Sequence, residues 1–480
     1  MQPHPASVHG SDAVQSFRTA DKEHGMADKA MRERLKTIRD REAADFTERR
    51  PRSADLSRRA RSVMPDGVPM AWMAGLHRHA PLFVAGGEGS TFVDVDGNSY
   101  VDFNLADLSN TAGFGPNAVA RAVEAQAARG MQFLLPGEDS IVVACELAAR
   151  TRMPFWQFTI SASSANTEVI RIARALTGRR KIVMFDGKYH GHFDTAMTTG
   201  GAPGDNEPAV VQGLGLSPAA AADAVNVPFN DLARLEAALE AGDVALVIAE
   251  PALTNCSLVL PEPGFLAGAC RLARDHGALT CLDETHTWQL AYGGFVRAED
   301  LSPDFVSLGK GLGSGTPLGA YGMSAPVSGF VEEHHEAADS PVRGLALGGT
   351  TFASALSMAA ARAMLEDVAT EEGYRRIARL GTRLADGIDA IIRSHGLDWC
   401  AFRYGPRSGF CQTPQHPKTY AEAHHSMDIS FSDALRLYMA NRGVWEAIYS
   451  AGPQVSFAHA EADIDRYLEV AGSFISELHA

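Results

Sequence analysis

The sequence predicts an α/β protein, with a mostly parallel central sheet in a large domain and a smaller α+β domain made from N- and C-terminal segments. Three observations predict this fold. Short, fully apolar runs alternate with helical patterns from about residue 115 onward. A hairpin pattern precedes them around Asp96-Gly97, and long helical patterns follow after about Met358. Alternating strands and helices form a parallel sheet that is covered on both faces, so the central part of the chain is the large domain.

Four parts of the chain follow from these patterns. Residues 1–50 form a mobile leader and an appended, exposed helix rich in alternating charges, and residues 51–114 form the N-terminal part of the small domain. Residues 115–357 form the large domain, and residues 358–480 complete the small domain. The hairpin is expected to carry Val93, Val95, Tyr100 and Val101, and the last strand-like piece is Gln454–Phe457.

A strand of the large domain is expected at Phe155–Ile160. Four further strands are expected from short apolar runs of the fully buried kind, at Lys181–Phe185, Val244–Ala249, Ala278–Leu282 and Phe305–Leu308. Helices are expected at residues 118–128, 140–150, 168–176 and 264–276. The last of these stops at Gly277, a residue type that commonly ends helices.

Composition excludes several classes of protein. A chain of 480 residues with 45% apolar residues can bury a large core, and a net charge of −15 offers no basic stripe for nucleic acid. The six cysteines are scattered and mostly lie in apolar runs, which favours a reducing compartment over a disulfide framework. No run is long enough to cross a membrane, and the first residues lack the pattern of a signal peptide. A cytoplasmic protein without a membrane or nucleic-acid partner is expected.

One lysine stands in an unusual place. The expected strand Phe305–Leu308 ends at Gly309, and Lys310 follows among Gly, Ser, Thr and Leu residues. With no carboxylate beside it in the sequence, its ammonium would favour loss of the charge or covalent use. Two interpretations stay open from this segment alone: an imine-forming lysine that awaits an aldehyde cofactor, or a surface lysine in a glycine-rich loop.

Ligands of open parallel sheets gather at the carboxyl ends of the strands, where this chain places further reactive residues. Ser161–Asn166 follows one strand and opens a helix, so its backbone donors can hold a phosphate, although its side chains can equally be mere helix caps. Asp186–His192 follows another strand and offers the ring of Tyr189. Asp283 and Glu284 leave a third, and buried acids imply a cationic partner.

These residues meet the requirements of pyridoxal phosphate. This cofactor needs a lysine for its imine, a carboxylate at the pyridine nitrogen, an aromatic side chain on the ring and a phosphate cradle. Each requirement has a candidate at a strand end. A metal site is not expected, because His190 and His192 are two residues apart and neither they nor His286 forms a ligand cluster with a cysteine pair.

Several short motifs also resemble a known family when they are taken in order. They are Ala60-Arg-Ser-Val-Met-Pro-Asp-Gly-Val68, Arg171-Ile-Ala-Arg-Ala-Leu-Thr-Gly-Arg-Arg-Lys181, Tyr189-His190-Gly191, Ala249-Glu250-Pro251, Asp283-Glu284, Leu308-Gly309-Lys310 and Gly349-Thr350. From about Ala60 to its C-terminus, the chain resembles a class III aminotransferase of the fold-type I superfamily of pyridoxal phosphate enzymes. The branch is that of glutamate-1-semialdehyde aminomutase and the beta-phenylalanine and D-phenylglycine aminotransferases.

The resemblance implies a role for each matched residue. Lys310 would form the Schiff base and shuttle protons, Asp283 would hold the pyridinium nitrogen, and Tyr189 would stack on the ring. Thr350 would reach the phosphate of the neighbouring subunit's cofactor, which implies a homodimer; without the resemblance it is a loop cap. Ala162 and Ser163 would bind the phosphate, and the other expected cofactor contacts are Ser161, His190, Glu250 and Thr285.

Three matched motifs are altered. The family's Ser-Gly-Thr-Glu-Ala phosphate loop is Ser161-Ala162-Ser163-Ser164-Ala165, which keeps a hydroxyl but loses the glycine and the acid. The Asp-Glu-Val motif, whose valine lies under the cofactor, ends in Thr285. The arginine that often follows is replaced by His286-Thr287-Trp288-Gln289. Cofactor binding is still expected, whereas the family's substrate contacts do not carry over.

Three functions are consistent with the cofactor residues. The leading hypothesis is an aminotransferase, in which Lys310 moves a proton while an amino group passes from an amine or amino acid to an oxo-acid or aldehyde. The alternative is an intramolecular aminomutase of the glutamate-1-semialdehyde 2,1-aminomutase type, which would use the same residues. A non-catalytic, cofactor-binding regulator is disfavoured because Lys310 and Asp283 are both retained. Because the usual carboxylate-binding arginines are absent, the sequence favours transfer.

The substrate contacts expected from the sequence are apolar. Trp72, Met73 and Trp288 predict an aromatic entrance with His286 and Gln289 beside it, although both tryptophans are equally consistent with packing. A hydrophobic amine is then expected to react at least as well as the matching amino acid. Four other arginines could still reach in to bind a carboxylate: Arg78, Arg343, Arg403 and Arg407.

Overall fold

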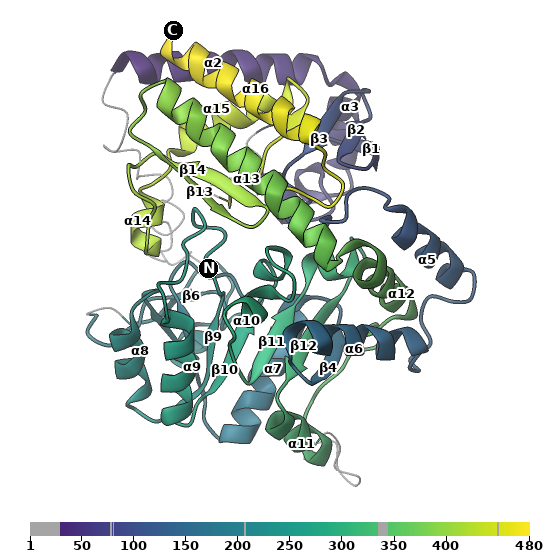
Figure 1. Ribbon diagram of the computed structural model, residues 1–480, viewed down its shortest axis with the longest axis vertical. Helices are drawn as coiled ribbons and strands as arrows, with labels where there is room; N and C mark the ends of the chain where they lie inside the picture. The colour runs from purple at the N-terminus through teal and green to yellow at the C-terminus, as the bar shows by residue number, and fades with distance from the viewer. Residues whose placement is uncertain (1–28, 77–78, 80, 206–207, 335–343, 449–450) are drawn as a thin grey trace, which may run out of the picture.

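A seven-stranded sheet forms the centre of the large domain (Figure 1). The computed structural model describes residues 29–76, 79, 81–205, 208–334, 344–448 and 451–480. The strand order is β4-β12-β11-β10-β9-β5-β8, and only β12 runs antiparallel to its neighbours. The expected mostly parallel sheet is therefore confirmed. Its strands are β4 (Phe155–Thr159), β5 (Lys181–Phe185), β8 (Ala224–Val227), β9 (Val244–Ala249), β10 (Leu279–Asp283), β11 (Phe305–Leu308) and β12 (Gly319–Met323).

All five strands expected from the sequence are present, whereas β8 and β12 were not predicted. β12 contains two glycines, which usually weaken a strand. Here both allow close packing. A Cβ atom on Gly319 would lie 2.3 Å from the backbone of Ser161, and one on Gly322 would lie 2.8 Å from the ring of Trp156. The glycines thus bring the central sheet against the start of the helix after β4.

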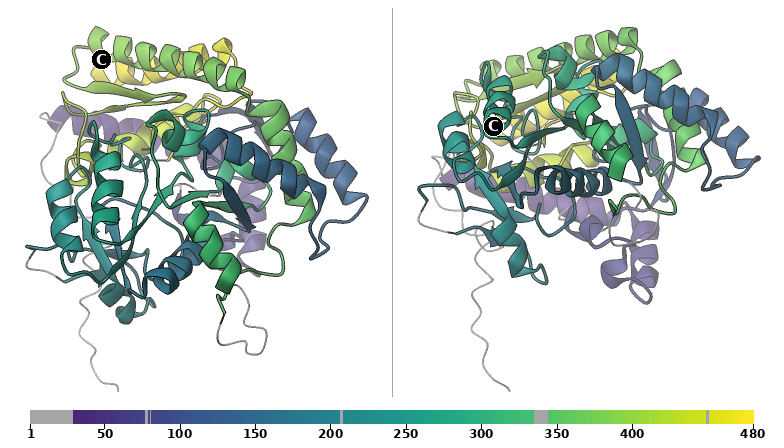
Figure 2. Two further views of the ribbon diagram at one scale, coloured as in Figure 1. Left: turned by 60° about the horizontal axis from the view of Figure 1, so that its bottom comes forward. Right: turned by 90° about the horizontal axis from the view of Figure 1, so that it is seen from below.

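Side chains of alternate residues enter two separate cores, because successive residues of a strand point to opposite faces. In β5, Val183 and Phe185 pack in one core, and Ile182 and Met184 pack in the other. Helices consequently cover both faces of the sheet (Figure 2). The helices of this domain are α5 (Asn117–Ala127), α6 (Glu138–Thr151), α7 (Ala162–Thr177), α8 (Leu232–Leu239), α9 (Phe265–Asp275), α10 (Gly294–Ala298), α11 (Ala325–His334) and α12 (Ala355–Ala363).

Short elements complete the large domain and its borders. The short helices are η1 (Pro65–Gly67), η2 (Pro218–Asp223), η3 (Thr287–Gln289), η4 (Lys310–Gly313) and the π-helical η5 (Met364–Val368). A two-stranded ribbon joins β6 (Thr198–Thr199) and β7 (Val210–Val211). Of these, η4 matters most for function because it begins at Lys310.

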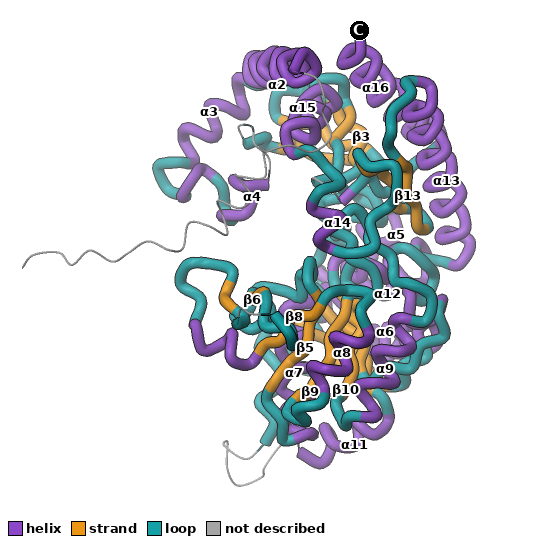
Figure 3. Tube along the Cα trace, turned by 90° about the vertical axis from the view of Figure 1, so that its left-hand side faces the viewer, coloured by secondary structure: helices purple, strands orange, loops and turns teal. Residues whose placement is uncertain are grey.

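The second, smaller domain joins the two ends of the chain (Figure 3). Its four-stranded sheet has the order β1-β2-β3-β15, and β15 from the C-terminal segment runs parallel to β3 of the N-terminal hairpin. Its strands are β1 (Val84–Glu88), β2 (Thr91–Asp94), β3 (Ser99–Asp102) and β15 (Val444–Trp445), and a separate pair is formed by β13 (Cys400–Tyr404) and β14 (Arg407–Cys411). Its helices are α2 (Lys29–Glu48), α3 (Pro51–Ala60), α4 (Ala71–Leu76), α13 (Glu371–Ser394), α14 (Tyr420–His424), α15 (Ile429–Ala440) and α16 (Glu461–His479).

Two expectations for this domain are wrong. Gln454–Phe457 is not a strand: only an isolated bridge joins Gln454 to Arg407, and the C-terminal strand is β15. The charged helix near the N-terminus is not an exposed appendage, because α2 lies against α15 and α16 (Figure 1). It buries Leu35 and Ile38 in the core of the small domain. The leader at residues 1–24 lies outside the described residues.

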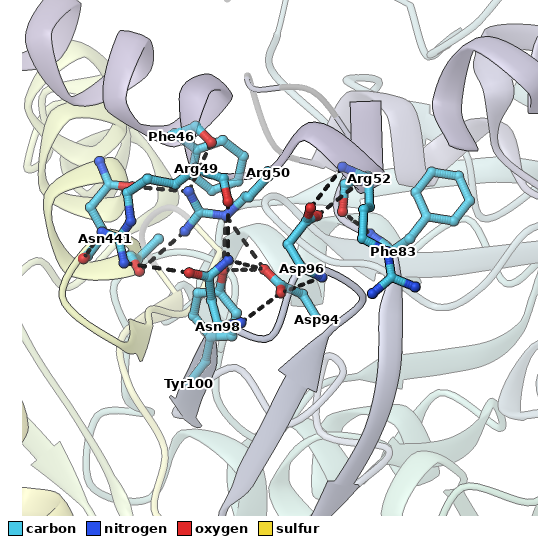
Figure 4. Close-up of polar contacts among 12 residues, drawn as sticks. Phe46, Arg49, Arg50, Arg52, Phe83, Asp94, Asp96, Asn98, Tyr100 and Asn441 are labelled. Atoms are coloured by element: carbon cyan, nitrogen blue, oxygen red, sulfur yellow. Dashed lines mark hydrogen bonds and ion pairs between the residues drawn. The ribbon is translucent and has the colours of Figure 1, made fainter. Parts of the chain in front are cut away.

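Arg50 shows how tightly this N-terminal segment is joined to the domain (Figure 4). Its side chain is buried and donates to the hydroxyl of Tyr100 at 2.8 Å, to the backbone oxygen of Phe46 at 2.9 Å and to Asn441 Oδ1 at 3.1 Å. The Tyr100 hydroxyl in turn donates to Asp94 at 2.7 Å. One cation thereby joins α2, the hairpin and the end of α15. Among the helices described, none combines the length and apolar character needed to span a membrane.

Candidate active site

The carboxyl ends of five strands bring the expected cofactor residues to one edge of the large sheet. Ser161 follows β4, Tyr189 follows β5, Glu250 follows β9, Asp283 ends β10 and Lys310 follows β11. These strands point the same way, because β4 and β11 are both antiparallel to β12, which lies between them. Residues far apart in the sequence therefore meet where a parallel sheet gathers its ligands.

Asp283 lies at the centre of this group and is held as a carboxylate. Its Oδ2 accepts hydrogen bonds from Asn166 Nδ2 at 2.8 Å and from His190 Nδ1 at 2.9 Å. Its Oδ1 accepts from the backbone N–H and the hydroxyl of Thr285 at 3.1 and 2.6 Å. Burial alone would raise the pKa of Asp283, but these donors, His190 first, outweigh it and the pKa lies below its ordinary value. The partner of this acid is thus an imidazole rather than a lysine or arginine.

Glu284, the other acid at the end of β10, has a structural role. Its carboxylate accepts from the hydroxyl of Thr287 at 2.5 Å and from the backbone N–H groups of Phe295 and Val296 at 3.1 and 2.7 Å. Burial raises the pKa of Glu284 to about 7. The cationic partner expected for a buried acid here is replaced by neutral donors.

The start of α7 is closely approached by two glycines. A Cβ atom on Gly309, the residue before Lys310, would lie 2.9 Å from the Cβ of Ala162, and one on Gly191 would lie 2.5 Å from Ser163 Oγ. Ser161 caps α7, since its hydroxyl accepts from the backbone N–H of Ser164 at 3.2 Å. The first turn of a helix presents N–H groups and positive potential, which suits a phosphate group.

Tyr189 has the exposed aromatic face that a stacking role requires. Its residue is 53% exposed, and its backbone N–H donates to Glu250 Oε1 at 2.7 Å. Glu250 is buried beside Asp283, and burial raises its pKa to about 8. Glu250 therefore holds the loop that carries Tyr189 and adds little negative charge to the edge of the sheet.

Lys310 has a carboxylate partner, which corrects the expectation of an isolated ammonium. Its Nζ donates to the backbone oxygen of Asp107 at 2.9 Å and forms an ion pair with the Asp107 carboxylate. No local pattern around Lys310 indicates this contact, because Asp107 belongs to the segment after β3 in the other domain. The only available signal was an acid within the otherwise apolar and neutral run Phe103–Leu108.

Arg407 of β14 also lies beside this group, and it is buried in an unusual way. Its guanidinium donates to the backbone oxygens of Ala451 and Thr254 at 2.6 and 3.3 Å and to Gln454 Oε1 at 3.2 Å. Within the described ranges no carboxylate forms an ion pair with it, although only 2% of the residue is exposed. Burial lowers the pKa of Arg407 to about 10, opposed by the charges of Asp107 and Glu446, so it stays a cation at neutral pH.

His286 connects Arg407 with the lysine side of the site. Its Nδ1 lies 2.5 Å from the hydroxyl of Thr254, the residue whose backbone oxygen accepts from Arg407. Burial, with the nearby charges of Lys310 and Arg407, keeps the pKa of His286 well below its ordinary value. The imidazole is therefore neutral. Of the other three arginines considered from the sequence, Arg403 is exposed and bonds to Thr382, and Arg78 and Arg343 lie outside the described residues.

The residues of the predicted aromatic entrance lie in different surroundings. Trp288 is a core residue, 2% exposed and packed among large aliphatic side chains, so its assignment as a substrate contact is wrong. Gln289 is also buried, and a Cβ atom on Gly311 would lie 2.2 Å from its Oε1, so it supports the backbone next to Lys310. Trp72 and Met73 lie on α4 with 53% and 45% exposure, and their role at the site stays a prediction.

Thr350 lies beside an exposed apolar groove. Gln132 donates to the Thr350 backbone oxygen at 2.9 Å. A groove of about 570 Å³ next to it is lined by Gln132, Leu134, Leu135, Ile141, Trp156 and Phe352, among others. Leu134 and Leu135 are 69% and 75% exposed. Exposed apolar patches of this kind mark interaction surfaces.

The residues at the sheet edge fit pyridoxal phosphate. Asp283 is kept ionised, as a partner of a pyridinium nitrogen must be, and Tyr189 offers an open ring face. Gly191 and Gly309 leave the first turn of α7 free of obstructing side chains for a phosphate. Thr285 stands in place of the family's valine, and its methyl carbon would lie 3.5 Å from a Cβ atom on Gly309. Its hydroxyl donates a hydrogen bond to Asp283.

Comparison with known proteins agrees with this geometry. The profile of the family described as aminotransferase class-III matches residues 73–397. The chain belongs to the class-III aminotransferases. It is 33% identical over 439 residues to a glutamate-1-semialdehyde 2,1-aminomutase of Desulfitobacterium hafniense (strain Y51), covering 89% of this chain and 98% of the relative.

Solved structures extend the likeness of this class-III aminotransferase. A glutamate-1-semialdehyde aminomutase of Pseudomonas aeruginosa PAO1, in complex with PMP, has a TM-score of 0.86 and 36% identity, covering 93% of this chain and 98% of that one. A beta-phenylalanine aminotransferase of Variovorax paradoxus has a TM-score of 0.80 and 25% identity, covering 92% and 97%. The chain is therefore a fold-type I enzyme whose cofactor is pyridoxal phosphate.

Proposed function

We propose that this enzyme moves an amino group within a carboxylate-bearing amino aldehyde, as an aminomutase of the glutamate-1-semialdehyde 2,1 type. Relatives of that name cover nearly the whole chain. The absence of the usual arginines had favoured transfer to a separate acceptor, and Arg407 removes that objection. It is the single observation that carries the proposal, because a buried cation without an ion-paired acid calls for an anion.

Arg407 is suited to a carboxylate in its geometry as well as its charge. A guanidinium has five N–H groups, and three of them are used by Ala451, Thr254 and Gln454. The remaining two can form a paired, charge-assisted bond to a carboxylate. His286 beside it is neutral and does not compete for this anion.

Lys310 and Asp283 supply the chemistry around the cofactor. Pyridoxal phosphate, when bound, draws electrons from the carbon that bears the amino group. Asp283, ionised within its four hydrogen bonds, favours the protonated pyridine nitrogen on which that withdrawal depends. Lys310, at the neighbouring strand end, takes the proton released from carbon and returns it at the new position. Buried Glu250 and His286 help to exclude water from these transfers.

Transfer between two separate substrates is the second candidate. An omega-transaminase of Sphaerobacter thermophilus has a TM-score of 0.80 and 26% identity, covering 89% of this chain and 98% of that one. The exposed side chains of Trp72 and Met73 would suit a hydrophobic amine donor. The donor and acceptor of such a reaction would be a small amine or amino acid and an oxo-acid or aldehyde.

An assay without an external acceptor distinguishes these functions. The enzyme loaded with the amino form of the cofactor receives glutamate 1-semialdehyde alone, and the product amine at carbon 1 is measured over many turnovers. Sustained conversion is expected from an aminomutase. Conversion that stops after one turnover, and resumes only when an oxo-acid and amine pair is added, would show a transaminase instead.

A homodimer also forms part of the proposal. The groove beside Thr350 would be covered by a second copy of the chain, and Thr350 would then contact the partner's cofactor phosphate. The exposed position of Thr350 supports this role. The four-part division of the chain at residues 50, 114 and 357 and the cytoplasmic location stay proposals, the latter supported by six free cysteines.

A further inference from the structure

None of the site residues expected from the sequence explains why Asp107 lies where it does. It is the ion-pair partner of Lys310, and within the described part of the chain Lys310 is the only hydrogen-bond partner of its carboxylate. The Asp107 side chain is 25% exposed and that of Lys310 is 19% exposed. The acid therefore stands where a substrate can approach the lysine.

The backbone that carries Asp107 is strained. Leu105, Ala106, Asp107 and Leu108 have φ values of 54°, 49°, 53° and 66°, so four successive residues other than glycine adopt the left-handed conformation. Each costs about 1–2 kcal/mol relative to the right-handed conformation, and such strain gathers at functional sites.

The surrounding structure holds this turn in place. Asp102 Oδ1 accepts from the backbone N–H groups of Asn104 and Leu105 at 2.9 and 3.0 Å. Leu105 and Leu108 are both buried, at 1% and 3% exposure. The chain thus stabilises a costly turn from both sides, and its consequence is to place one carboxylate against Lys310.

We propose that Asp107 is a catalytic residue that binds the ammonium group of the incoming substrate and takes its proton. An ammonium has no free electron pair, so the amine must lose a proton before it can displace Lys310. This inference rests on the proposed function in requiring an amine substrate, and in migration as in transfer it concerns the half-reaction in which an amine reacts with the lysine-bound cofactor.

The step balances in protons and bonds. One proton would leave the substrate nitrogen for an Asp107 carboxylate oxygen, and the freed electron pair would form the bond to the cofactor carbon that Lys310 holds as an imine. A second proton would pass from the substrate nitrogen to Lys310 Nζ as the bond from Nζ to that carbon breaks, so that Lys310 leaves as a neutral amine. Asp107 and Lys310 would then share the proton taken up by Asp107 through the contact that the structure shows between them, which would let Lys310 act as acid or base.

Four other titratable groups lie near the pair: Tyr189, Glu250, His286 and Arg407. Burial raises the pKa of Tyr189, and the negative charge of Asp107 raises it further. Asp107 also lies near the positive charge of Arg407. Lys310 lies near Glu250 and His286, both buried. Among the described titratable groups around Lys310, Asp107 is the one that combines a negative charge, partial exposure and a contact with Lys310 Nζ.

The test uses the full chain reconstituted with pyridoxal phosphate and no substrate. Absorbance of the lysine-bound cofactor is titrated from pH 5 to pH 10 in the wild type, in Asp107→Asn and in Ala106→Gly. Asparagine tolerates the left-handed conformation, and Ala106 is exposed in the same turn, so Ala106→Gly relieves strain while it keeps the acid. The midpoint is expected to fall by at least about 1 pH unit in Asp107→Asn, because a nearby carboxylate favours the protonated imine. Ala106→Gly should titrate like the wild type.

The substrate arm uses the pH dependence of kcat/KM for the same variants. At pH 7, Asp107→Asn should lose at least about tenfold in kcat/KM, and the loss should shrink near pH 9.5, where more of the amine is already deprotonated. An unchanged titration midpoint, an equal shift in Ala106→Gly, or a loss that is independent of pH would each overturn the proposal. The titration tests the role of Asp107 even if the chosen substrate is wrong, because it is carried out without substrate.

Discussion

Replacing Arg407 by methionine tests the substrate assignment most sharply. The guanidinium is buried, so a carboxylate bound to it would be desolvated, and loss of one partner of such a pair costs about 2–5 kcal/mol. That corresponds to a fall in kcat/KM of roughly 30-fold to several thousand-fold. Arg407→Met also leaves Thr254, Ala451 and Gln454 without a donor, so part of any loss is structural.

A pair of substrates separates the two effects. Glutamate 1-semialdehyde carries the carboxylate, and 2-aminopentanal has a methyl group in its place. Structural damage lowers kcat/KM for both substrates, whereas a lost carboxylate contact lowers it only for the acid. The fold-loss in kcat/KM for the acid, divided by the fold-loss for 2-aminopentanal, therefore measures the contact between Arg407 and the carboxylate. Arg407→Lys keeps a charge and should show a smaller ratio than Arg407→Met. If Arg407→Met impaired the two substrates equally, Arg407 would not be the carboxylate ligand, and the apolar site expected from the sequence would stand.

Three further predictions concern other parts of the molecule. Asp283→Asn should fold and bind cofactor but slow the first half-reaction roughly hundredfold in stopped flow, as expected if the pyridine pKa falls by about two units; a normal rate would refute the role of Asp283. Burial lowers the pKa of His459 from 6.5 to about 4. As the pH falls, His459 is therefore protonated in the unfolded chain before it is protonated in the folded protein. Stability should therefore be complete above pH 6.5 and fall by roughly 3 kcal/mol toward pH 4, with a flatter slope in His459→Asn; equal slopes in denaturant titrations would contradict this. Leu135→Asp in the groove should give a monomer in light scattering, while Leu214→Asp, 96% exposed outside the groove, should not; an unchanged mass for Leu135→Asp would remove the groove from the interface.

The parts of the fold that the sequence predicted are those governed by local rules. β5, β9 and β11 are mostly apolar runs and were placed at their observed bounds. β12 was not predicted, because glycine disfavours a strand by local propensity. Its two glycines are required instead by close contacts with Ser161 and Trp156.

The candidate site shows the same division. Lys310, Asp283 and Tyr189 could be placed because parallel strands bring their carboxyl ends to one edge. Asp107 could not, since no local pattern predicts four successive left-handed residues, and such turns exist only where the rest of the structure compensates. Arg407 was one of four candidates, and only the pairing of β13 with β14 and the contacts of its buried guanidinium distinguished it.

The whole account depends on Lys310 as the residue that carries the cofactor. Borohydride reduction of the pyridoxal-phosphate-loaded protein, followed by peptide mapping, tests this directly, with Lys310→Ala and Lys188→Ala as a matched pair. Lys188 is the informative control, because burial lowers its pKa to about 8 and it also lies near Glu250. The label is expected on Lys310 alone, lost in Lys310→Ala and retained in Lys188→Ala. A label on Lys188 or any other lysine would contradict the account.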